Sequence, residues 1–265
     1  MNIVPFYPVR VLPTEDYFNA DWIYSFGEKI SNHKVRYFNS PIELFKALPK
    51  NEPLHFFGMS RQMVVLYLLM LRKDCEKDIT PHTCFGKYPP WGMPINLFPV
   101  LSKLMRQFSK IKAVSKYEFQ YYQQRGFSNI VYEPLFVDTG YFKVLEGLRI
   151  KHGAGVLCMG ADRAIKNIKT IIKACAKAGR KLTILDDVEP GSNEFNQAFM
   201  QNDTFVSSSY MEGFSLGAAE AQASGMKLCL SNLPTLKMQY GKGALYHEPD
   251  DYEKLAVNIS SGFRI

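Results

Sequence analysis

The sequence predicts an α/β protein made of two Rossmann-like domains, each with a parallel sheet covered by helices. Two observations lead to this prediction. Short apolar segments alternate with helical segments along the chain, and 265 residues are enough for two modest domains. A hydrophobic content of 46% and a charged content of 22% are typical of a soluble globular protein. We expect the first domain over residues 1–145 and the second over residues 146–265.

In the first domain, alternating short strands and helices follow from the apolar pattern. Strands are expected within 2–6, 31–38, 53–57, 79–83, 112–115 and 129–136, and helices within 16–30, 41–49, 60–71, 97–111 and 116–126. The expected helix 97–111 places Leu104, Phe108 and Ile111 on one face and basic residues such as Lys103 and Arg106 on the other. This helix either packs on the core with a solvated basic face or makes peripheral contact with an anionic membrane.

In the second domain the same alternation continues, with clear helix stop signals. Strands are expected within 156–159, 181–185, 202–209 and 226–231, and helices within 167–178, 193–200 and 216–224. Gly179 and Gly225 lie where a left-handed residue ends a helix. The loop Asp186–Ser192 leads almost directly into the next helix.

Composition excludes several classes of protein. The five cysteines are odd in number and lack a C-x-x-C pair, so we expect neither a disulfide framework nor a zinc cluster. This cysteine content favours a reducing, cytoplasmic location. No signal peptide opens the chain and its longest apolar run, 63–71, is too short to span a bilayer, so we do not expect an integral membrane protein. Most of the net charge of +7 lies in residues 1–145, which indicates either attraction to an acidic partner or simple solubility.

The segment from Glu212 to Gly225 is the strongest candidate for a ligand site. Ser215 is a good N-cap, and the helix expected from Leu216 begins with small residues, so an anion such as a pyrophosphate can approach its first N–H groups. Glu212 precedes this anion site and Glu220 follows it on the helix. Carboxylates on both sides suit a ligand with hydroxyl groups at both ends, which describes a nucleotide sugar. The alternative is an ordinary amphipathic helix with two solvated glutamates.

The same segment resembles a known enzyme signature. Glu212-Gly213-Phe214-Ser215-Leu216, followed by Glu220-Ala221-Gln222-Ala223-Ser224-Gly225, is similar to the Glu-x7-Glu motif of retaining GT-B glycosyltransferases of family 4, the glycosyl transferases group 1 class. The resemblance covers most of residues 110–258. It implies a compact GT-B fold, with two domains facing across a cleft. It also implies sugar transfer from a nucleotide-diphosphate donor to a hydroxyl acceptor with retention, without a metal or other cofactor.

The resemblance assigns roles to individual residues. Glu212 would bind the donor sugar and Glu220 the ribose, while Gly213 and the amides of Phe214–Leu216 would contact the diphosphate. Lys166 matches the phosphate-binding lysine of the family. The residue after Gly160 is Ala161, where the family has an arginine, and Arg163 stands two places later. Either Arg163 substitutes for that contact by reaching from the loop, or one phosphate contact is missing.

From the first domain, His82 matches the histidine that the family places near the reacting sugar; a hydrogen-bonded loop residue is the ordinary interpretation, and His55 is the rival candidate. The loop 5–10 lacks the paired glycines usual in the family, and the strand and helix usually found after 186–192 are missing. These departures keep open a non-catalytic GT-B-like subunit that binds a nucleotide sugar.

The expected partners are a nucleotide-sugar donor and a hydroxyl acceptor on a glycan, a lipid or a protein. A glucosyltransferase acting on nucleic acid is a third option, motivated only by the basic N-terminal half; nucleic acid is not the expected partner.

Overall fold

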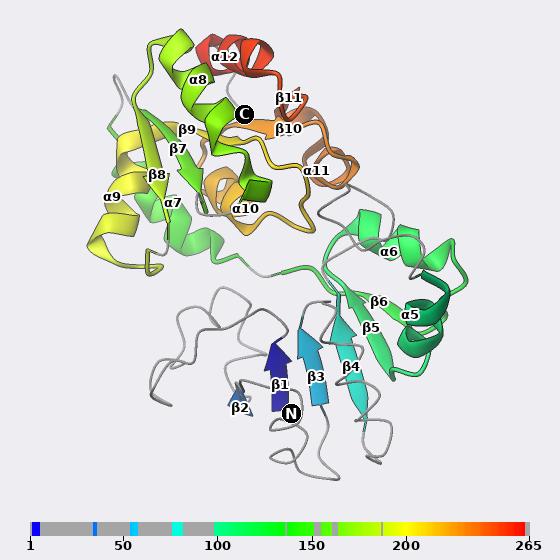
Figure 1. Ribbon diagram of the computed structural model, residues 1–265. Helices are drawn as coiled ribbons and strands as arrows, with labels where there is room; N and C mark the ends of the chain where they lie inside the picture. Colours follow the sequence, from blue (N-terminus) through cyan, green and yellow to red (C-terminus); the bar gives the residue numbers. More distant parts are fainter. Residues whose placement is uncertain are drawn as a thin grey trace. The chain divides into compact units, whose positions relative to one another are not determined.

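The structure is a computed structural model that describes residues 2–5, 34–35, 54–57, 76–81, 98–135, 137–150, 155–160, 164–186 and 188–262 (Figure 1). The chain divides into two compact units, Met1–Pro134 and Leu135–Ile265. Each unit contains a sheet whose paired strands all run parallel, as the alternating pattern predicts. The fold class is therefore α/β with parallel sheets.

The sheet of unit 1 has the strand order β2-β1-β3-β4-β5-β6. Its elements are β1 (Asn2–Pro5), β2 (Lys34–Val35), β3 (Leu54–Phe57), β4 (Lys77–Thr80), α5 (Phe98–Met105), β5 (Lys110–Ala113), α6 (Lys116–Gln123) and β6 (Ile130–Tyr132). Helix α6 begins at a true N-cap, because the Ser115 hydroxyl accepts a hydrogen bond from the Glu118 N–H at 3.1 Å. The helices expected over 16–30, 41–49 and 60–71 lie outside the described residues.

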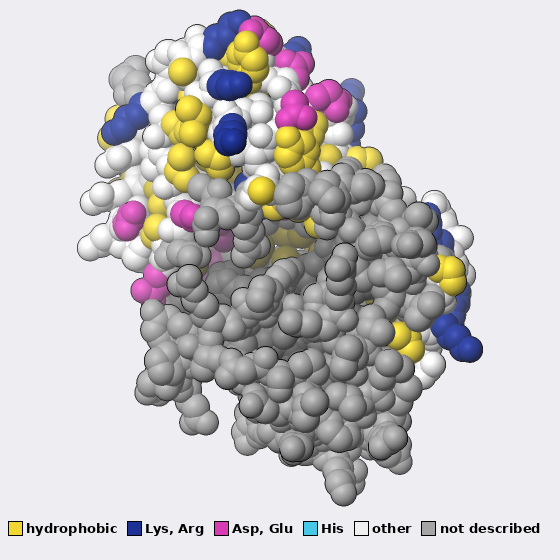
Figure 2. Space-filling view, viewed as in Figure 1, with side chains coloured by type: hydrophobic (Ala, Val, Ile, Leu, Met, Phe, Trp, Pro, Cys, Tyr) yellow, Lys and Arg dark blue, Asp and Glu magenta, His cyan; other side chains and the backbone are white. Residues whose placement is uncertain are grey.

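The single helix predicted over 97–111 is wrong. Helix α5 ends at Met105, and Lys110–Ala113 form β5, which pairs with β4 and β6. Ile111 is fully buried as a strand residue. Arg106 lies in the turn between them, where its guanidinium donates to the Arg125 carbonyl at 2.8 Å and lies over the Phe127 ring. Basic side chains lie on the surface in the region of α5 and α6 (Figure 2). Because Lys103 lies in α5 and Lys110 in β5, they do not line one continuous helix.

The sheet of unit 2 has the order β11-β10-β9-β7-β8. Its strands are β7 (Gly155–Met159), β8 (Leu182–Leu185), β9 (Asn202–Ser207), β10 (Lys227–Ser231) and β11 (Leu245–His247). Its helices are α7 (Thr139–Gly147), η3 (Ala164–Lys166), α8 (Ile168–Ala178), α9 (Asn193–Gln201), α10 (Leu216–Ala223), α11 (Pro234–Tyr240), η4 (Gly241–Gly243) and α12 (Tyr252–Ser260). Gly179 and Gly225 are left-handed just beyond α8 and α10, as predicted.

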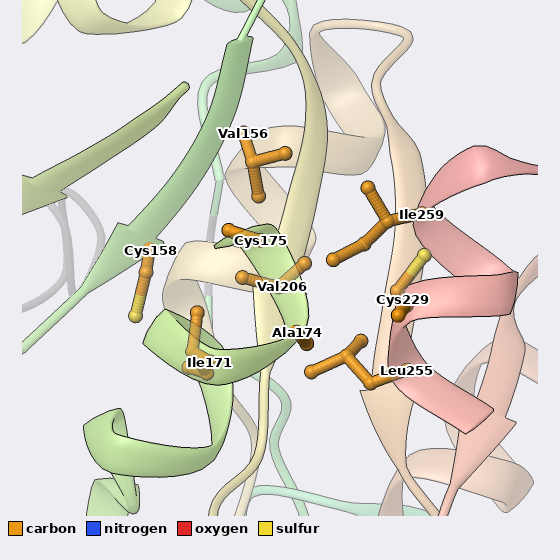
Figure 3. Close-up of a cluster of buried hydrophobic side chains, with 10 residues drawn as sticks. Val156, Cys158, Ile171, Ala174, Cys175, Val206, Cys229, Leu255 and Ile259 are labelled. Carbon is orange, nitrogen blue, oxygen red and sulfur yellow. The ribbon is translucent and has the colours of Figure 1, made fainter. Parts of the chain in front are cut away.

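The core of unit 2 has a layer on each face of the sheet. On one face, side chains of β7, β9 and β10 pack against α8 and α12, which lie side by side (Figure 3). This cluster consists of Val156, Cys158, Ile171, Ala174, Cys175, Val206, Cys229, Leu255, Ala256 and Ile259. Cys158, Cys175 and Cys229 are free thiols that act here as small apolar side chains. On the other face, α9 and α10 pack on the strands, and α7 packs on both helices.

The two units divide earlier in the chain than the expected boundary at 145/146, because α7 belongs to unit 2. Phe142 of α7 packs against the rings of Phe195 and Phe199 on α9, with ring centroids 6.2 and 5.1 Å away. Just after α7, the Arg149 guanidinium donates to the carbonyls of Phe199 and Ser224. Aromatic packing and these hydrogen bonds attach the segment to α9 and α10. Within the described part of the chain, no helix combines the length and the apolar character needed to cross a bilayer.

Candidate functional site

The order of strands in unit 2 marks the place where a ligand site is expected. From β7 the chain moves to β8 on one side and then returns to β9 on the other side. The loops that follow β7 and β9 therefore lead away from each other at the carboxyl end of the sheet, and such a switch point is where open α/β sheets bind ligands. The two loops lie between β7 and η3 and between β9 and α10 (Figure 1). Lys166 ends η3, just after the first loop, and Glu212 lies in the second loop.

Local backbone geometry shapes the loop after β7. Gly160 has a φ of +77°, a conformation that a side chain would strain, and Asn167 is left-handed at the start of α8. The Asn167 amide donates to the Pro249 carbonyl at 2.8 Å and to the Asp250 carboxylate at 3.1 Å. These bonds fix the end of the loop and hence the position of Lys166, which immediately precedes Asn167.

The loop after β9 is attached to the first loop. The Tyr210 N–H donates to the Ile165 carbonyl at 2.9 Å, and the Tyr210 hydroxyl donates to Asp250. Asp250 thus accepts hydrogen bonds from both loops, through Tyr210 and Asn167. Tyr210 lies two residues before Glu212, so this junction sets the separation between Glu212 and Lys166.

Lys166 and Glu212 form an ion pair across the two loops. The Lys166 Nζ lies 2.7 Å from the Glu212 Oε1, and their side chains are 24% and 9% exposed. The Ser209 hydroxyl donates to the same oxygen at 2.7 Å. Ser209 in turn lies 3.0 Å from the Ser207 hydroxyl. The structure therefore brings a cation and a carboxylate, far apart in sequence, into one partly buried polar cluster at the switch point.

Helix α10 begins at Leu216, as predicted, but the capping role predicted for Ser215 is wrong. Ser215 has a φ of 60°, and its side chain makes no cap hydrogen bond. The Ser215 carbonyl instead accepts from the Tyr240 hydroxyl at 3.4 Å. Because the first N–H groups of a helix have no partner within the helix, a first turn without a side-chain cap retains donors for an anion.

Gly217 brings the start of α10 close to the sheet. A Cβ at this position would lie 3.0 Å from the Met159 Sδ and 3.2 Å from the Phe205 ring, tighter than ordinary contact. Met159 ends β7 and Phe205 lies in β9. The absent side chain therefore places the first turn of α10 against the two strands that form the switch point.

Glu220 lies one turn further along α10 and is buried, with 8% of its surface exposed. Burial raises the pKa of its carboxyl group to about 7. Within the described residues, no hydrogen-bond donor pairs with this carboxylate. Burial is the main cause that raises the pKa of Tyr141 on α7 and of Tyr240 on α11, and the charge of Glu220 adds to both shifts, so these phenols are its titratable neighbours. A buried carboxylate without a donor is costly unless a ligand supplies one.

The predicted site residues that the structure describes lie in unit 2. Lys166 and Glu212 are in direct contact, Gly213 and Phe214 complete the loop, and Ser215 and Leu216 start α10. Arg163, His82 and the rival His55 side chain lie outside the described residues.

Sequence reasoning missed Ser209, Tyr240 and Asp250. The sequence could have indicated Ser209, because side chains alternate between the two faces of a strand and Ser207 and Ser209 would then point to the same face. No group of three or more His, Cys, Asp or Glu side chains in the described ranges is arranged to hold a metal ion.

No protein-family model matches the chain. No curated protein sequence matches it either. Solved structures match by fold. A UDP-forming α,α-trehalose-phosphate synthase from Burkholderia vietnamiensis aligns with 12% identity and a TM-score of 0.58, over 83% of this chain and 68% of that one. An E. coli trehalose-6-phosphate structure bound with UDP-2-fluoro glucose aligns with 10% identity and a TM-score of 0.59, over 83% and 67%.

A sucrose-phosphate synthase from Thermosynechococcus elongatus aligns with 16% identity and a TM-score of 0.59, over 78% of this chain and 63% of that chain. The chain thus spans about two thirds of the length of these structures. The shared feature is the fold, with two Rossmann-like units and parallel sheets, and this is the GT-B fold that the sequence predicts.

Proposed function

We propose that this protein is a retaining glycosyltransferase of the family 4 type, which transfers a sugar from a nucleotide-diphosphate donor to a hydroxyl acceptor. The observation that carries the proposal is the contact between Lys166 and Glu212 at the switch point, beside the uncapped first turn of α10. This arrangement offers positive charge to a diphosphate and a carboxylate to a sugar hydroxyl in the same place. The fold likeness to synthases described as UDP-forming supports the same reaction class.

Each end of the donor has a matching group in this proposal. Lys166 and the first amides of α10 stabilise the diphosphate, whose negative charge grows as the glycosidic bond breaks. Arg163 assists from the loop after β7. Glu220 accepts hydrogen bonds from the ribose hydroxyls, and Glu212 accepts one from the sugar. His82 acts near the reacting carbon, and the lysine and helix amides provide the charge stabilisation for which other enzymes use a metal.

The acceptor is a hydroxyl group, and sugar phosphates are the first acceptors to test because one of the similar synthases was solved with glucose-6-phosphate. A cytoplasmic location and peripheral contact with anionic membrane belong to the same proposal. The support for membrane contact is the set of basic side chains on the surface in the region of α5 (Figure 2). Lys103 of α5 and Lys110 of β5 are both exposed. Pelleting with anionic and neutral vesicles tests it, and equal pelleting with both would contradict it.

A thermal-shift panel of UDP-glucose, GDP-mannose and ADP-glucose, with donor hydrolysis measured in the same samples, tests the function. A ligand at about 100 times its dissociation constant adds about 2.7 kcal/mol to the free energy of unfolding, so donor binding gives a clear shift. Binding with turnover supports the glycosyltransferase. Binding without turnover, even with acceptors, identifies a non-catalytic nucleotide-sugar-binding subunit, an alternative favoured by Ala161 in place of the family's arginine. A protein that binds none of the three sugars refutes both.

A further inference from the structure

Three consecutive serines at the end of β9 make contacts in two different directions. Ser207, Ser208 and Ser209 are all buried, with 7%, 0% and 0% of their surfaces exposed. The Ser209 hydroxyl bonds to Glu212 and lies next to the Ser207 hydroxyl, whereas the Ser208 hydroxyl lies 2.9 Å from the His247 Nε2. Neighbouring serines of equal burial therefore have separate partners, and only Ser209 contacts the proposed site directly.

The hydrogen bonds around Glu212 are unequally divided between its two oxygens. Oε1 accepts from Ser209 and from Lys166, each at 2.7 Å. Within the described residues, Oε2 accepts no hydrogen bond. Ser209 has one hydroxyl proton, which it gives to Glu212, so the hydroxyl of Ser207 donates to Ser209 at 3.0 Å. The chain of hydroxyls thus orients one carboxylate oxygen and leaves the other for a ligand.

The two donors to Oε1 differ in what an incoming ligand does to them. Lys166 is a mobile cation on a flexible stem, and a diphosphate competes with Glu212 for it. Ser209 is fully buried next to the strand and cannot follow the diphosphate. When Lys166 turns to the diphosphate, Ser209 remains as the donor that keeps Glu212 in its orientation.

We infer that Ser209 is a positioning residue for the donor sugar, because it fixes Oε1 of Glu212 so that Oε2 accepts a sugar hydroxyl. This inference rests on the proposed function, since it requires Glu212 to contact the sugar. It makes Ser209 a determinant of how strongly the site prefers a nucleotide sugar over the free nucleotide diphosphate. Ser209 affects this preference only through Glu212.

The test measures that preference as the ratio of the affinities for UDP-glucose and UDP, or for the GDP-mannose and ADP-glucose pairs where the panel identifies those bases. We expect Ser209→Ala to lower the ratio about fivefold, which is the effect of one net hydrogen bond of about 1 kcal/mol. Affinity for the diphosphate alone stays within about twofold of the wild-type value. Ser208→Ala is the matched control: it removes an equally buried hydroxyl and leaves the ratio unchanged.

A double-mutant cycle with Glu212→Ala separates positioning from general loosening of the fold. If Ser209 acts through Glu212, Ser209→Ala has no further effect on the ratio once Glu212 is absent. A wild-type ratio in Ser209→Ala, or an equal additional loss in the double mutant, overturns the inference and leaves the proposed function intact. A wild-type protein that binds no nucleotide sugar overturns the proposed function, and the inference with it. Melting temperatures of all variants show whether each one folds.

Discussion

The two glutamates of the Glu-x7-Glu segment lie in different regions: Glu212 in the loop before α10 and Glu220 within α10. The two regions differ in the hydrogen-bond donors that they offer to the carboxylate. Glu212 in the loop receives a lysine and a serine on one oxygen. Glu220 on the helix has no such donor among the described residues, and burial raises the pKa of its carboxyl group to about 7. The same type of side chain is held as an oriented ion pair in one region, and in the other it is divided about equally between charged and neutral forms near pH 7.

This difference indicates that the two glutamates have different roles in binding the donor. The charge of Glu212 is balanced before a ligand arrives, so its task is to present an acceptor in a defined direction. Glu220 lacks a donor, so a ligand that supplies hydroxyl groups relieves the cost of its burial. Binding free energy is therefore expected to come mainly from Glu220, and orientation of the reacting sugar mainly from Glu212.

Removal of Glu220 provides the strongest test of this comparison. Glu220→Ala loses two hydroxyl-to-carboxylate hydrogen bonds, each contributing about 1.5–3 kcal/mol, so donor affinity falls by more than about 100-fold. The thermal shift with a nucleotide sugar disappears. Glu253→Ala is the control, because Glu253 is an exposed carboxylate on α12, paired with Lys177. A normal ligand-induced shift in Glu220→Ala would contradict the role of this helix position.

Removal of Glu212 is expected to act on the rate instead. Loss of a group that stabilises the transition state costs about 100-fold in turnover, whereas the nucleotide diphosphate keeps its contacts with Lys166 and α10. Glu212→Ala therefore retains its thermal shift with UDP while donor hydrolysis or transfer falls by about 100-fold. Isothermal titration and turnover assays on the same preparation measure both. If Glu212→Ala lost affinity for UDP as severely as Glu220→Ala loses affinity for the donor, the proposed difference in role between the two glutamates would be contradicted.

The sequence predicted much of this arrangement because the relevant signals are local. The run of small residues in α10, the left-handed Gly225 and the alternation of strands and helices each act over a few residues. The failed helix 97–111 shows the limit: Leu104, Phe108 and Ile111 fit the spacing of a helix, but Ile111 also fits the alternation of β5, and only pairing with β4 decides between them.

Residues of the site that were missed depend on tertiary contacts. Ser215 has the chemistry of an N-cap, but its backbone is left-handed and the Tyr240 hydroxyl bonds to its carbonyl. Ser209 reaches Glu212 only because the loop after β9 turns back on itself. Asp250 joins two loops from a distant part of the chain. The helix and strand propensities of residues and the spacing of apolar residues do not predict these tertiary contacts.

The affinity for the donor is also predicted to depend on pH, because Glu220 titrates and Glu212 is held in an ion pair. With a pKa of about 7 in the free protein and the charged form required for ribose binding, donor affinity rises with pH and changes about tenfold between pH 6 and pH 8. Titrations with a nucleotide sugar at both pH values measure it, and Glu220→Gln, which has no charge to titrate, is the control. An affinity that is flat across this range would contradict either the raised pKa of Glu220 or the requirement for its charged form in ribose binding.

The same shift has the opposite sign for stability. Because the folded-state pKa of Glu220 lies above the usual value of 4.5, the folded state without ligand holds a proton that the unfolded chain releases. This contribution to the free energy of unfolding is present below about pH 4.5 and is lost as the pH rises through about 7. Glu220→Gln is therefore expected to flatten the fall in melting temperature over that interval.

The smallest expected effect concerns Tyr240 on α11, whose pKa is raised mainly by burial and also by the charges of both Glu212 and Glu220. Its hydroxyl bonds to the Ser215 carbonyl at 3.4 Å, a long distance for a hydrogen bond, so Tyr240→Phe should weaken donor binding only about twofold. Because Ser215 precedes the first turn of α10, UDP and UDP-glucose should be affected equally, in contrast to Ser209→Ala. Tyr246→Phe is the matched control, since that hydroxyl bonds to Gly241 and Leu236 outside the proposed site. A selective loss for UDP-glucose in Tyr240→Phe would instead assign this phenol to the sugar side, beside Glu212.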